Sequence, residues 1–424
     1  MIFGQHDPNT LEQFHAVKGG TVHAALMADG HYGYIMPVGG VAAYRNAVSV
    51  NGVGFDIACG NCAIATDLML PDLMDEELAS GDILAQRNII SSSERLAEFG
   101  DLIMSRISFG VGRSNVTKDA PTDHEVFMDD RWWLVPDAHR ATLREKARTQ
   151  LGTVGSGNHY VDVFVDPDTD YIWVGVHFGS RGFGHTIASN YLAMGQGGAW
   201  GDTATEAEVI LDLSTSIGQD YWNLMELAGD YAYAGREWVT AQVVDMLGGH
   251  VVDVVHNHHN FAWKETHFGE ELVVVRKGAT PAFPGQLGFV GGSMGDNAVI
   301  LEGARDGTVS NQQAALYSTV HGAGRVMSRT AAAGKRNRKT GELKRNKETG
   351  EIINPGKISA EMMQGWLDET GVVLRGAGRD EAPQAYRRLP DVLAAQGDTI
   401  NVLHTLKPLI VVMAAANEFD PYKE

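Results

Sequence analysis

Four short stretches of the sequence carry side chains that bind metal ions in proteins. GVGFDIACG (52–60) places an aspartate three residues before a cysteine, and histidines occur in GTVGSGNHYVD (152–162), GVHFGSRGFGH (175–185) and HNHHNF (256–261). A thiolate has several lone pairs and can bridge two cations, so these side chains could complete two three-ligand sites with open positions. The predicted ligands are Asp56, Cys59, His159, His177 and His259.

The same cysteine allows other interpretations. Cys59 and Cys62 form a CxxC pair and are the only cysteines of the chain, which excludes a disulfide framework. A redox pair needs a thioredoxin-like context at a helix start, and a zinc ribbon needs a second CxxC. Any one of the histidines, taken alone, fits a structural role. Asp56 and Cys59 together in one loop favour a metal site, with Cys62 as a small core residue.

The elements that position these residues are expected to be strands and helices interspersed along the whole chain. The 424 residues are 44% hydrophobic, which is enough to bury a large core. No repeat or long low-complexity linker divides them, so we predict one mixed α/β (α+β) domain over residues 1–424, with β-sheets surrounded by helices. Apolar patterning predicts strands at 32–44, 171–179 and 272–279, and helices at 137–150, 204–247 and 359–369.

Glycine is abundant beside the polar residues of interest. The chain has 50 glycines, and many of them adjoin a His, Asp or Arg. A glycine at such a position lets the backbone approach a ligand closely or take positive φ. Each polar stretch also begins or ends an apolar run, so we expect several loops at strand ends to face one shared cleft.

Charge gives two opposing indications. The formal net charge of −19 repels polyanions at long range and argues against bulk, non-specific nucleic-acid binding. A linker-like loop at about 333–357 nevertheless contains the basic run KRNRKTGELKRNK. This loop is either a solvated surface segment or a segment that contacts phosphates, and both interpretations stay open.

The sequence predicts a cytoplasmic protein without a membrane partner. The N-terminal residues MIFGQHDPNT lack the basic region and apolar stretch of a signal peptide. The apolar run LIVVMAAA near the C-terminus is shorter than the ~18 to 20 residues that a membrane-spanning helix needs.

Seven motifs, taken in order, resemble those of the RtcB family of RNA-splicing ligases. They are GVGFDIACG, LGTVGSGNH, HFGSRG, HHNFAWKETHFGEE, VVRKGA, GSMG and HGAGRVMSR. The resemblance implies a single RtcB-like domain that uses GTP and Mn²⁺ to join RNA ends bearing a 2′,3′-cyclic phosphate or 3′-phosphate to 5′-hydroxyl ends. It also implies RNA as substrate and an archease-like protein as a possible activator.

The resemblance assigns roles to individual residues. One Mn²⁺ would bind Cys59, His177 and His259, and the other Asp56, Cys59 and His159, so Cys59 would be the bridging ligand. His321 corresponds to the guanylylated histidine, and an imidazole nitrogen is a competent nucleophile at neutral pH. The arginines that would hold RNA phosphates are Arg181, Arg325 and Arg329, of which the last two share a face if their segment is helical.

The nucleotide site is likewise implied by the resemblance. The residues that correspond to it are Asn158, Asp162, Ser293, Met294, Gly295, His321, Gly322, Ala323 and Gly324. Asp29, His31 and His258 match further family positions, without an assigned role.

Two departures from the family pattern concern base selection. Asp162 stands where family members commonly carry a glutamate that reads the guanine edge, and it is one methylene shorter. Met413 stands where they commonly carry a guanine-contacting lysine. These changes keep two alternatives open: a metal-dependent RNA-end phosphatase or cyclic phosphodiesterase, and a non-catalytic RNA-binding paralogue.

Overall fold

The computed structural model describes residues 1–74, 93–337, 342–416 and 418. Its main element is an eight-stranded sheet with the order β10-β4-β8-β7-β18-β15-β14, in which β17 also pairs with β18. The neighbours from β10 to β14 are antiparallel, whereas β17 and β18 are parallel. The strands are β4 (Gly60–Met69), β7 (Tyr160–Val165), β8 (Tyr171–Phe178), β10 (Val251–His258), β14 (Leu287–Val290), β15 (Ala298–Gly303), β17 (Val373–Ala377) and β18 (Ile400–Ala415).

A four-stranded antiparallel sheet lies beside the larger one, with the order β1-β2-β12-β11. Its strands are β1 (His23–His31), β2 (Val38–Tyr44), β11 (Asn260–His267) and β12 (Glu270–Lys277). A single residue, His259, separates β10 from β11, so the chain passes directly from one sheet to the other at a predicted metal ligand. Three strand pairs complete the sheets: β3 (Ala47–Ser49) with β9 (Ile210–Asp212), β5 (Ser108–Phe109) with β6 (Thr153–Gly155), and β13 (Ala279–Pro281) with β16 (Ser318–Val320).

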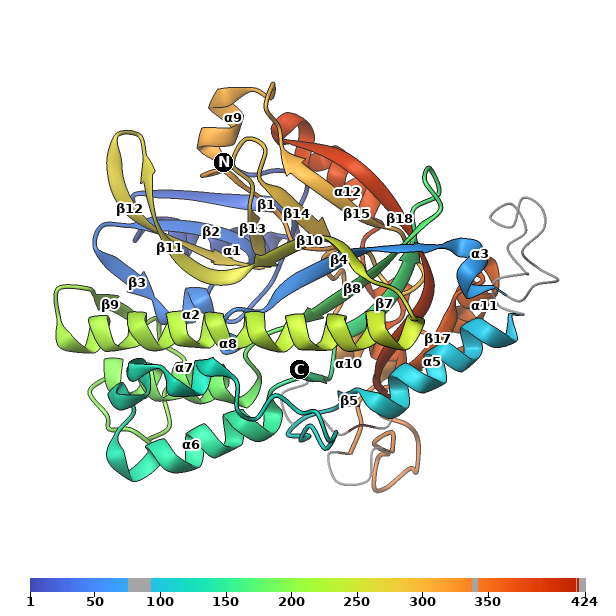
Figure 1. The fold of residues 1–424 in the computed structure, drawn as a ribbon. Coiled ribbons are helices and arrows are strands. Elements are labelled where there is room, and N and C mark those ends of the chain that lie inside the picture. The colour runs from blue at the N-terminus through green and yellow to red at the C-terminus, as the bar shows by residue number, and fades with distance from the viewer. Residues whose placement is uncertain (75–92, 338–341, 417, 419–424) are drawn as a thin grey trace.

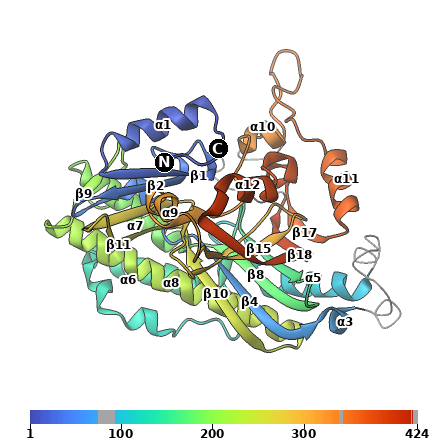
Figure 2. The same ribbon diagram turned by 90° about the horizontal axis from the view of Figure 1, so that it is seen from above.

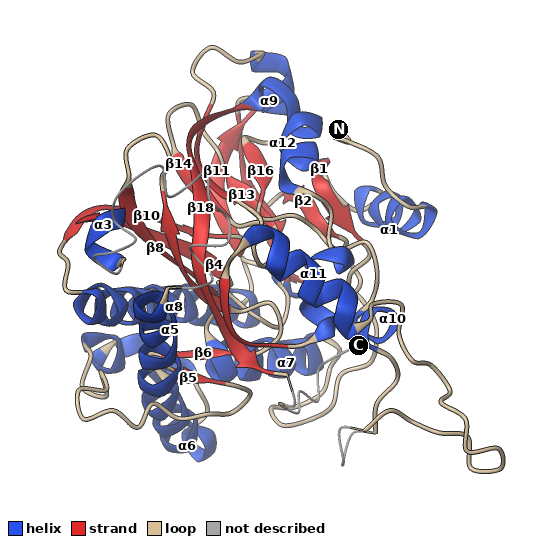
Figure 3. Cartoon of the chain, turned by 90° about the vertical axis from the view of Figure 1, so that its right-hand side faces the viewer, coloured by secondary structure: helices blue, strands red, loops and turns tan. Residues whose placement is uncertain are grey.

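Helices surround the sheets, as Figure 1 and Figure 3 show. The longest, α8 (Ser216–Leu247), begins where the Thr215 side chain caps the Gly218 amide and ends at Gly248 in the left-handed conformation. The other α-helices are α1 (Pro8–Lys18), α2 (Val50–Val53), α3 (Leu70–Leu73), α5 (Glu94–Arg106), α6 (Asp137–Gln150), α7 (Arg181–Gly195), α9 (Val309–Ala314), α10 (Arg329–Ala333), α11 (Ala360–Thr370) and α12 (Leu389–Gln396). Short 3₁₀ turns are η2 (Glu125–Met128), η3 (Asp130–Leu134), η4 (Arg379–Glu381), η5 (Pro383–Ala385) and η6 (Gly397–Thr399).

The core lies on both faces of the eight-stranded sheet. Along β7, Val161, Val163 and Val165 pack with residues of α5 and α8. Tyr160 and Phe164 point to the opposite face and pack with Phe289 of β14. Because side chains alternate along a strand, Asp162 lies on the same face as Tyr160 and Phe164. Burial of both faces explains why the strands are long apolar runs rather than alternating ones.

The structure confirms the mixed fold class and most of the predicted elements. The helices α6 and α11 and the strands β8 and β12 lie where they were predicted, and Cys62 is fully buried in the core. The prediction of one strand over 32–44 was wrong at 32–37, because β1 ends at His31 and β2 begins after Pro37. The predicted helix at 204–247 begins only at Ser216, since residues 210–212 form β9 instead.

Two further predictions concern the segment after His321. Arg325 and Arg329 do not share a helical face, because α10 begins only at Arg329 and Arg325 forms an isolated β-bridge with Tyr386. The predicted basic loop projects beyond α10 (Figure 2). Its residues Arg338 and Lys339 lie outside the described part of the chain. No helix among the described residues is long and apolar enough to cross a membrane.

Candidate metal centre and nucleotide pocket

Strand register brings the predicted ligands to one end of the large sheet. Cys59 immediately precedes β4 and His159 immediately precedes β7, whereas His177 is the penultimate residue of β8. In the ladder, Gly60 pairs with both Phe178 and His258, and Tyr160 pairs with His177. Because these neighbouring strands are antiparallel, the starts of β4 and β7 meet the ends of β8 and β10.

The backbone around Cys59 is tightly constrained. Ala58 has φ of 59°, a conformation rare for a residue with a side chain. The Cys59 amide donates to the Asp56 carbonyl at 3.1 Å, and the Cys59 carbonyl accepts from the His259 amide at 2.8 Å. Gly60 is required next to it, because a Cβ there would lie 2.1 Å from the Asn257 carbonyl oxygen. The sulfur is thus fixed relative to its neighbours by main-chain contacts.

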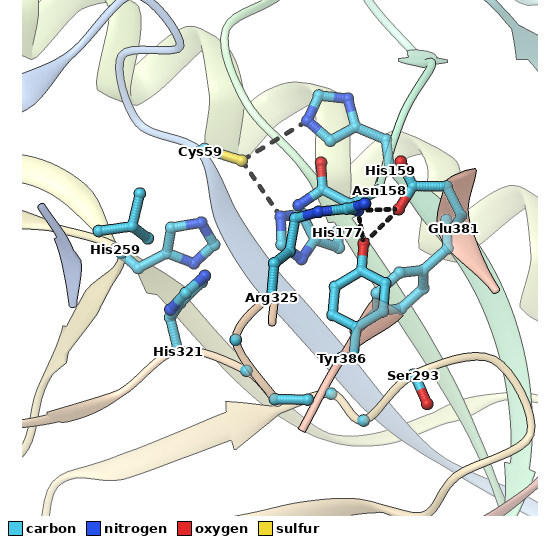
Figure 4. A pocket seen from close by; sticks show the side chains of 18 of the residues that line it. Cys59, Asn158, His159, His177, His259, Ser293, His321, Arg325, Glu381 and Tyr386 are labelled. Carbon is cyan, nitrogen blue, oxygen red and sulfur yellow. Dashed lines mark hydrogen bonds and ion pairs between the residues drawn. The ribbon is translucent and has the colours of Figure 1, made fainter. Parts of the chain in front are cut away.

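Four side chains, those of Asp56, His159, His177 and His259, lie around this sulfur, and Figure 4 shows the three histidines among them. Cys59 Sγ lies 3.3 Å from His177 Nε2 and 3.6 Å from His159 Nε2. His159 Nε2 lies 3.1 Å from Asp56 Oδ2. Two triplets of ligand atoms each lie within 4.8 Å of one another, namely Cys59, His177 and His259, and Asp56, Cys59 and His159. These are the same two sets that the sequence motifs implied, with Cys59 common to both.

The protonation states suit metal ligation. Burial, together with nearby cationic groups, holds the pKa values of His177 and His259 well below their usual range, so both imidazoles are neutral. His159 Nδ1 lies 2.9 Å from the Val154 carbonyl oxygen, a contact that orients the ring so that Nε2 faces both the sulfur and Asp56. Burial would raise the pKa of Asp56, but its hydrogen bond to His159 and the charges of His159 and Arg181 lower it to about 2.

Two properties of these five ligand side chains are not explained by contacts within the protein. His259 Nδ1 is buried and has no hydrogen-bond partner among the residues that the structure describes. Burial and the neighbouring Asp56 charge raise the pKa of Cys59 well above its usual value, so the thiol stays protonated unless a cation is bound. A thiol, three imidazoles and an ionised carboxylate fit one or two divalent transition-metal ions.

A buried guanidinium lies directly behind this centre. Arg236 of α8 is 0% exposed, and its Nη1 donates to the carbonyl oxygens of Ala58 at 2.9 Å and Phe178 at 2.6 Å. Its other nitrogens donate to His256 Nε2 at 2.7 Å and His258 Nδ1 at 2.9 Å. Arg236 therefore ties together the ends of β4, β8 and β10. Sequence reasoning missed it, because a lone arginine in a helix is usually a surface residue.

His321 faces the metal centre from a loop that follows β16. Its ring centroid lies 4.8 Å from that of His259, at an interplanar angle of 62°. The completely buried carboxylate of Asp29 accepts from the His321 main-chain amide at 3.0 Å and lies 2.6 Å from its Nδ1. An ionised carboxylate can only accept, so Nδ1 carries the proton, and in the neutral form of the ring the lone pair is therefore on Nε2. The motif that contains Asp29 was recognised in the sequence, but its role was not.

Two of the predicted phosphate-binding arginines are held by one glutamate. Arg325 Nη1 lies 3.1 Å from Glu381 Oε2, and Arg329 Nη1 forms an ion pair with the other carboxylate oxygen. The Tyr386 hydroxyl donates to Glu381 and accepts from Arg325 Nη1 at 2.7 Å (Figure 4). Glu381 is 4% exposed, so this is a nearly buried junction of charges. The motif analysis missed Glu381 and Tyr386, which lie more than fifty residues after Arg325.

A cavity of about 320 Å³ joins the two metal-ligand triplets to His321. Most of the residues assigned to the nucleotide and phosphates line it, together with the departure Met413. Two do not. Gly295 packs toward Trp366 and Thr370, and Arg181 lies behind the ligand loops, where its Nε donates to Thr153 Oγ1 at 3.3 Å. The assigned residues that line the cavity are Asn158, Asp162, Ser293, Met294, Gly322, Ala323, Gly324, Arg325 and Arg329.

Asp162 is a buried carboxyl in the cavity wall. It is 8% exposed, and its Oδ1 is buried without a hydrogen-bond partner in the described part of the chain. Burial raises the pKa of this carboxyl well above its ordinary value of 3.8, despite a hydrogen bond to the main chain of Val412. The side chain therefore favours the neutral acid, which offers one donor and one acceptor to a ligand.

Comparison with known proteins agrees with the motif pattern. The model of the family described as tRNA-splicing ligase RtcB matches residues 10–414. The RNA-splicing ligase RtcB of Escherichia coli strain K12 is 30% identical over 416 residues, covering 92% of this chain and 90% of that protein. The tRNA-splicing ligase RtcB of Thermococcus kodakarensis is 27% identical over 465 residues, covering 91% and 86%. RNA-splicing ligase RtcB homolog 1 of Entamoeba histolytica is 29% identical over 480 residues, covering 94% and 82%. The chain belongs to the RtcB family.

Proposed function

We propose that this protein is an RNA ligase that uses GTP and two Mn²⁺ ions to join 2′,3′-cyclic phosphate or 3′-phosphate ends to 5′-hydroxyl ends. Family membership and the names of the relatives support RNA ligation. The observation that carries the finer proposal is the position of His321, whose ring lies 4.8 Å from that of His259 while its Nδ1 is held by Asp29.

His321 is the proposed nucleophile. Asp29 keeps the proton on Nδ1, so Nε2 can attack the α-phosphorus of GTP. A nitrogen–phosphorus bond forms, the bond from the α-phosphorus to the bridging oxygen breaks, and pyrophosphate leaves. The RNA 3′-phosphate then displaces the histidine and takes the GMP group. Finally the 5′-hydroxyl attacks the activated 3′-phosphorus, its proton is lost, and GMP leaves. A cyclic phosphate is first opened by water to the 3′-phosphate.

The surrounding residues would hold charge around the reacting phosphorus. Arg325 and Arg329 line the cavity and offer planar pairs of donors that match phosphate oxygens. Arg181 adds positive charge near Asp56 from behind the ligand loops. Cys59, His177 and His259 would hold one metal ion, and Asp56, Cys59 and His159 the other. When bound, such ions supply Lewis acidity and neutralise charge on the phosphates.

The guanylyl group would occupy the part of the cavity lined by Asn158, Ser293, Met294 and the Gly322–Gly324 loop. Asp162 and Met413 lie on the facing strands β7 and β18, where Tyr160 pairs with Met413 and Asp162 with Val411. We propose that base selection depends on Asp162, which lines the cavity, so all four nucleotides are to be compared.

The test is covalent labelling of the full-length protein with α-³²P-labelled GTP, ATP, CTP or UTP in the presence of Mn²⁺. We expect acid-labile label from GTP, its complete loss in His321→Ala, and normal labelling in His15→Ala, where an exposed histidine on α1 is removed. Absence of label with every nucleotide would contradict the proposal.

The two alternatives give different results in parallel assays. A phosphatase or cyclic phosphodiesterase would open or remove the terminal phosphate with Mn²⁺ alone and would never form joined RNA. The departures at Asp162 and Met413 are the observations that favour it. A non-catalytic RNA-binding paralogue would show neither label nor processing, and metal analysis of the purified protein would find no stoichiometric ions.

A further inference from the structure

The basic segment after α10 has a charge opposite to that of the rest of the molecule. We define the basic arm as residues 334–337 and 342–357, which together contain six Lys or Arg and three Glu. The whole chain carries a formal net charge of −19. At physiological ionic strength charges act over about 8 Å, so a local basic surface can attract an anion that the molecule as a whole repels.

The basic arm has a regular backbone. The Lys335 amide donates to the Asn354 carbonyl at 3.1 Å, and the Lys344 amide donates to the Lys335 carbonyl at 2.7 Å. The Ile353 amide donates in turn to the Lys344 carbonyl at 2.9 Å. Two β-bridges, Arg336 with Leu343 and Arg345 with Ile352, run alongside. These contacts make a small antiparallel meander of the main chain.

The lysines of this meander are exposed and carry uncompensated charge. Lys335, Lys344 and Lys347 are all exposed, and none of them forms an ion pair with a carboxylate in the described parts of the chain. Arg345 is also exposed, and its Nη1 donates only to a main-chain oxygen, that of Gly350, at 2.9 Å. If these lysines stabilised the arm internally, they would form ion pairs with its glutamates. The solvated ammonium groups of Lys335, Lys344 and Lys347 instead remain available to an external anion.

The root of the basic arm is joined to the catalytic cavity. The amides of Lys357 and Ile358 donate to the carbonyls of Ala331 and Ala332 in α10, at 2.8 and 3.0 Å. Arg379 clamps the same root, because its guanidinium donates to the carbonyl oxygens of Ile358 at 3.0 Å and Ala333 at 3.3 Å.

The helix α10 starts at Arg329, which lines the cavity, and Arg379 is followed by the acidic residues that hold Arg325 and Arg329. A continuous set of contacts thus runs from the phosphate-binding arginines to the arm. From there the arm projects away from the body of the molecule (Figure 2 and Figure 3).

We propose that the basic arm binds the phosphate backbone of an RNA strand whose end lies in the His321 cavity. This inference rests on the proposed function, because it takes the cavity to be the place where RNA ends react. The arm begins at the cavity wall and extends outward, so a strand that leaves the cavity beside Arg329 passes along its lysines. Repeated phosphates match repeated, uncompensated ammonium groups, and the acidic body of the protein disfavours other paths.

The test compares two full-length variants with equal changes in charge. In the arm variant, Lys335, Lys344 and Lys347 are replaced by Ala. In the control variant, the exposed body residues Lys18, Lys118 and Lys264 are replaced by Ala. The probe is a fluorescein-labelled single-stranded RNA of 20 nucleotides with a 3′-phosphate, and its Kd is measured by anisotropy over a range of KCl concentrations.

We expect the arm variant to bind this RNA about tenfold more weakly at low salt. The slope of log Kd against log[KCl] should decrease by about 2, because each lost phosphate contact lowers it by ~0.7. Labelling of His321 by GTP should stay at the wild-type level, because the cavity is unchanged. An unchanged slope in the arm variant, or an equal loss in the control variant, would overturn the proposal.

Two further outcomes separate the arm from the proposed function. If the wild type shows no nucleotide label but RNA affinity still depends on the arm lysines, the arm proposal stands and the ligase proposal fails. If polyglutamate of equal charge displaces the RNA and binds more tightly in the same arm-dependent way, the surface takes an acidic polypeptide and the arm proposal is wrong.

Discussion

Asp29 Oδ2 lies 2.6 Å from Nδ1 of His321 and accepts from the main-chain amides of His321 at 3.0 Å and Gly322 at 3.4 Å. The carboxylate comes from the end of the small sheet and the histidine from a loop almost three hundred residues later. Asp29 therefore sets both the position and the tautomer of the proposed nucleophile, although it does not touch the reacting phosphorus.

Replacement of Asp29 by Asn should damage the first chemical step more than the fold. The amide can donate to Nδ1, which would favour the tautomer with the proton on Nε2 and remove the nucleophilic lone pair. We expect the rate of GTP labelling to fall by about 10²- to 10⁴-fold, while bound metal stays at the wild-type level. A labelling rate within twofold of wild type would show that Asp29 has no role in orienting His321.

Substitutions of Arg236 test whether its hydrogen bonds hold the metal ligands in place. Arg236→Lys keeps a positive charge but cannot reach both strand ends and both histidines at once. We expect Mn²⁺ affinity, measured by titration calorimetry, to fall by about 10- to 100-fold. Arg236→Met should in addition lower the free energy of unfolding by about 2 to 4 kcal/mol, because two buried carbonyls lose their donor. Loss of stability with unchanged metal affinity would limit Arg236 to a purely structural role.

The buried carboxyl of Asp162 should make the stability of the folded protein decrease with rising pH. Burial raises the pKa of its carboxyl in the folded state above the ordinary value of 3.8, so the folded protein binds more protons than the unfolded chain as soon as pH exceeds that value. Stability is therefore lost as pH rises toward the folded-state pKa, with a slope of at most about 1.4 kcal/mol per pH unit from this group.

Asp162→Asn imitates the neutral acid and should remove this loss. Urea unfolding is measured at several pH values from 4 upward. We expect the free energy of unfolding of the variant to increase relative to that of the wild type as pH increases. A difference that stays constant with pH would mean that Asp162 titrates normally in the folded protein.

Glu381 is the acidic counterpart of the two arginines in the cavity. Glu381→Gln leaves Arg325 and Arg329 without their shared carboxylate, and we expect a loss of about 3 to 5 kcal/mol in unfolding free energy. The two guanidiniums, of which Arg329 keeps its ion pair with Asp380, should then bind an added anion. Inorganic phosphate should raise the Tm of this variant more than that of the wild type. An equal increase in both proteins would count against the arginines as a phosphate site.

Part of this site could be predicted from the sequence because the residue types alone indicate metal binding. A thiol, a carboxylate and histidines at the ends of apolar runs indicated Cys59, Asp56 and His177 before any strand was paired. The grouping of the ligands into two triplets, by contrast, came from the family resemblance, because it depends on which strands are neighbours. The structure supplies that order through register contacts such as Tyr160 with His177.

The remaining features depend on contacts between segments distant in the chain. Residues 204–215 have helical composition, yet Ile210–Asp212 pairs with Ala47–Ser49 and becomes a strand. Glu381 meets Arg325 across 56 residues of sequence. Arg236 has the sequence context of an exposed helical residue, and only the crossing of α8 behind Ala58 and Phe178 buries it. Periodicity within one segment contains no information about such pairings.

The central claim is that one sulfur atom can hold two cations beside His321. The most direct measurement is anomalous diffraction at the manganese edge from crystals grown with Mn²⁺, with Cys59→Ala as the control. We predict two peaks in the wild type, both within about 3 Å of Cys59 Sγ and each next to one of the two triplets. We also predict the loss of at least one peak in the variant. No peak at Cys59, or peaks that remain unchanged in Cys59→Ala, would contradict this claim.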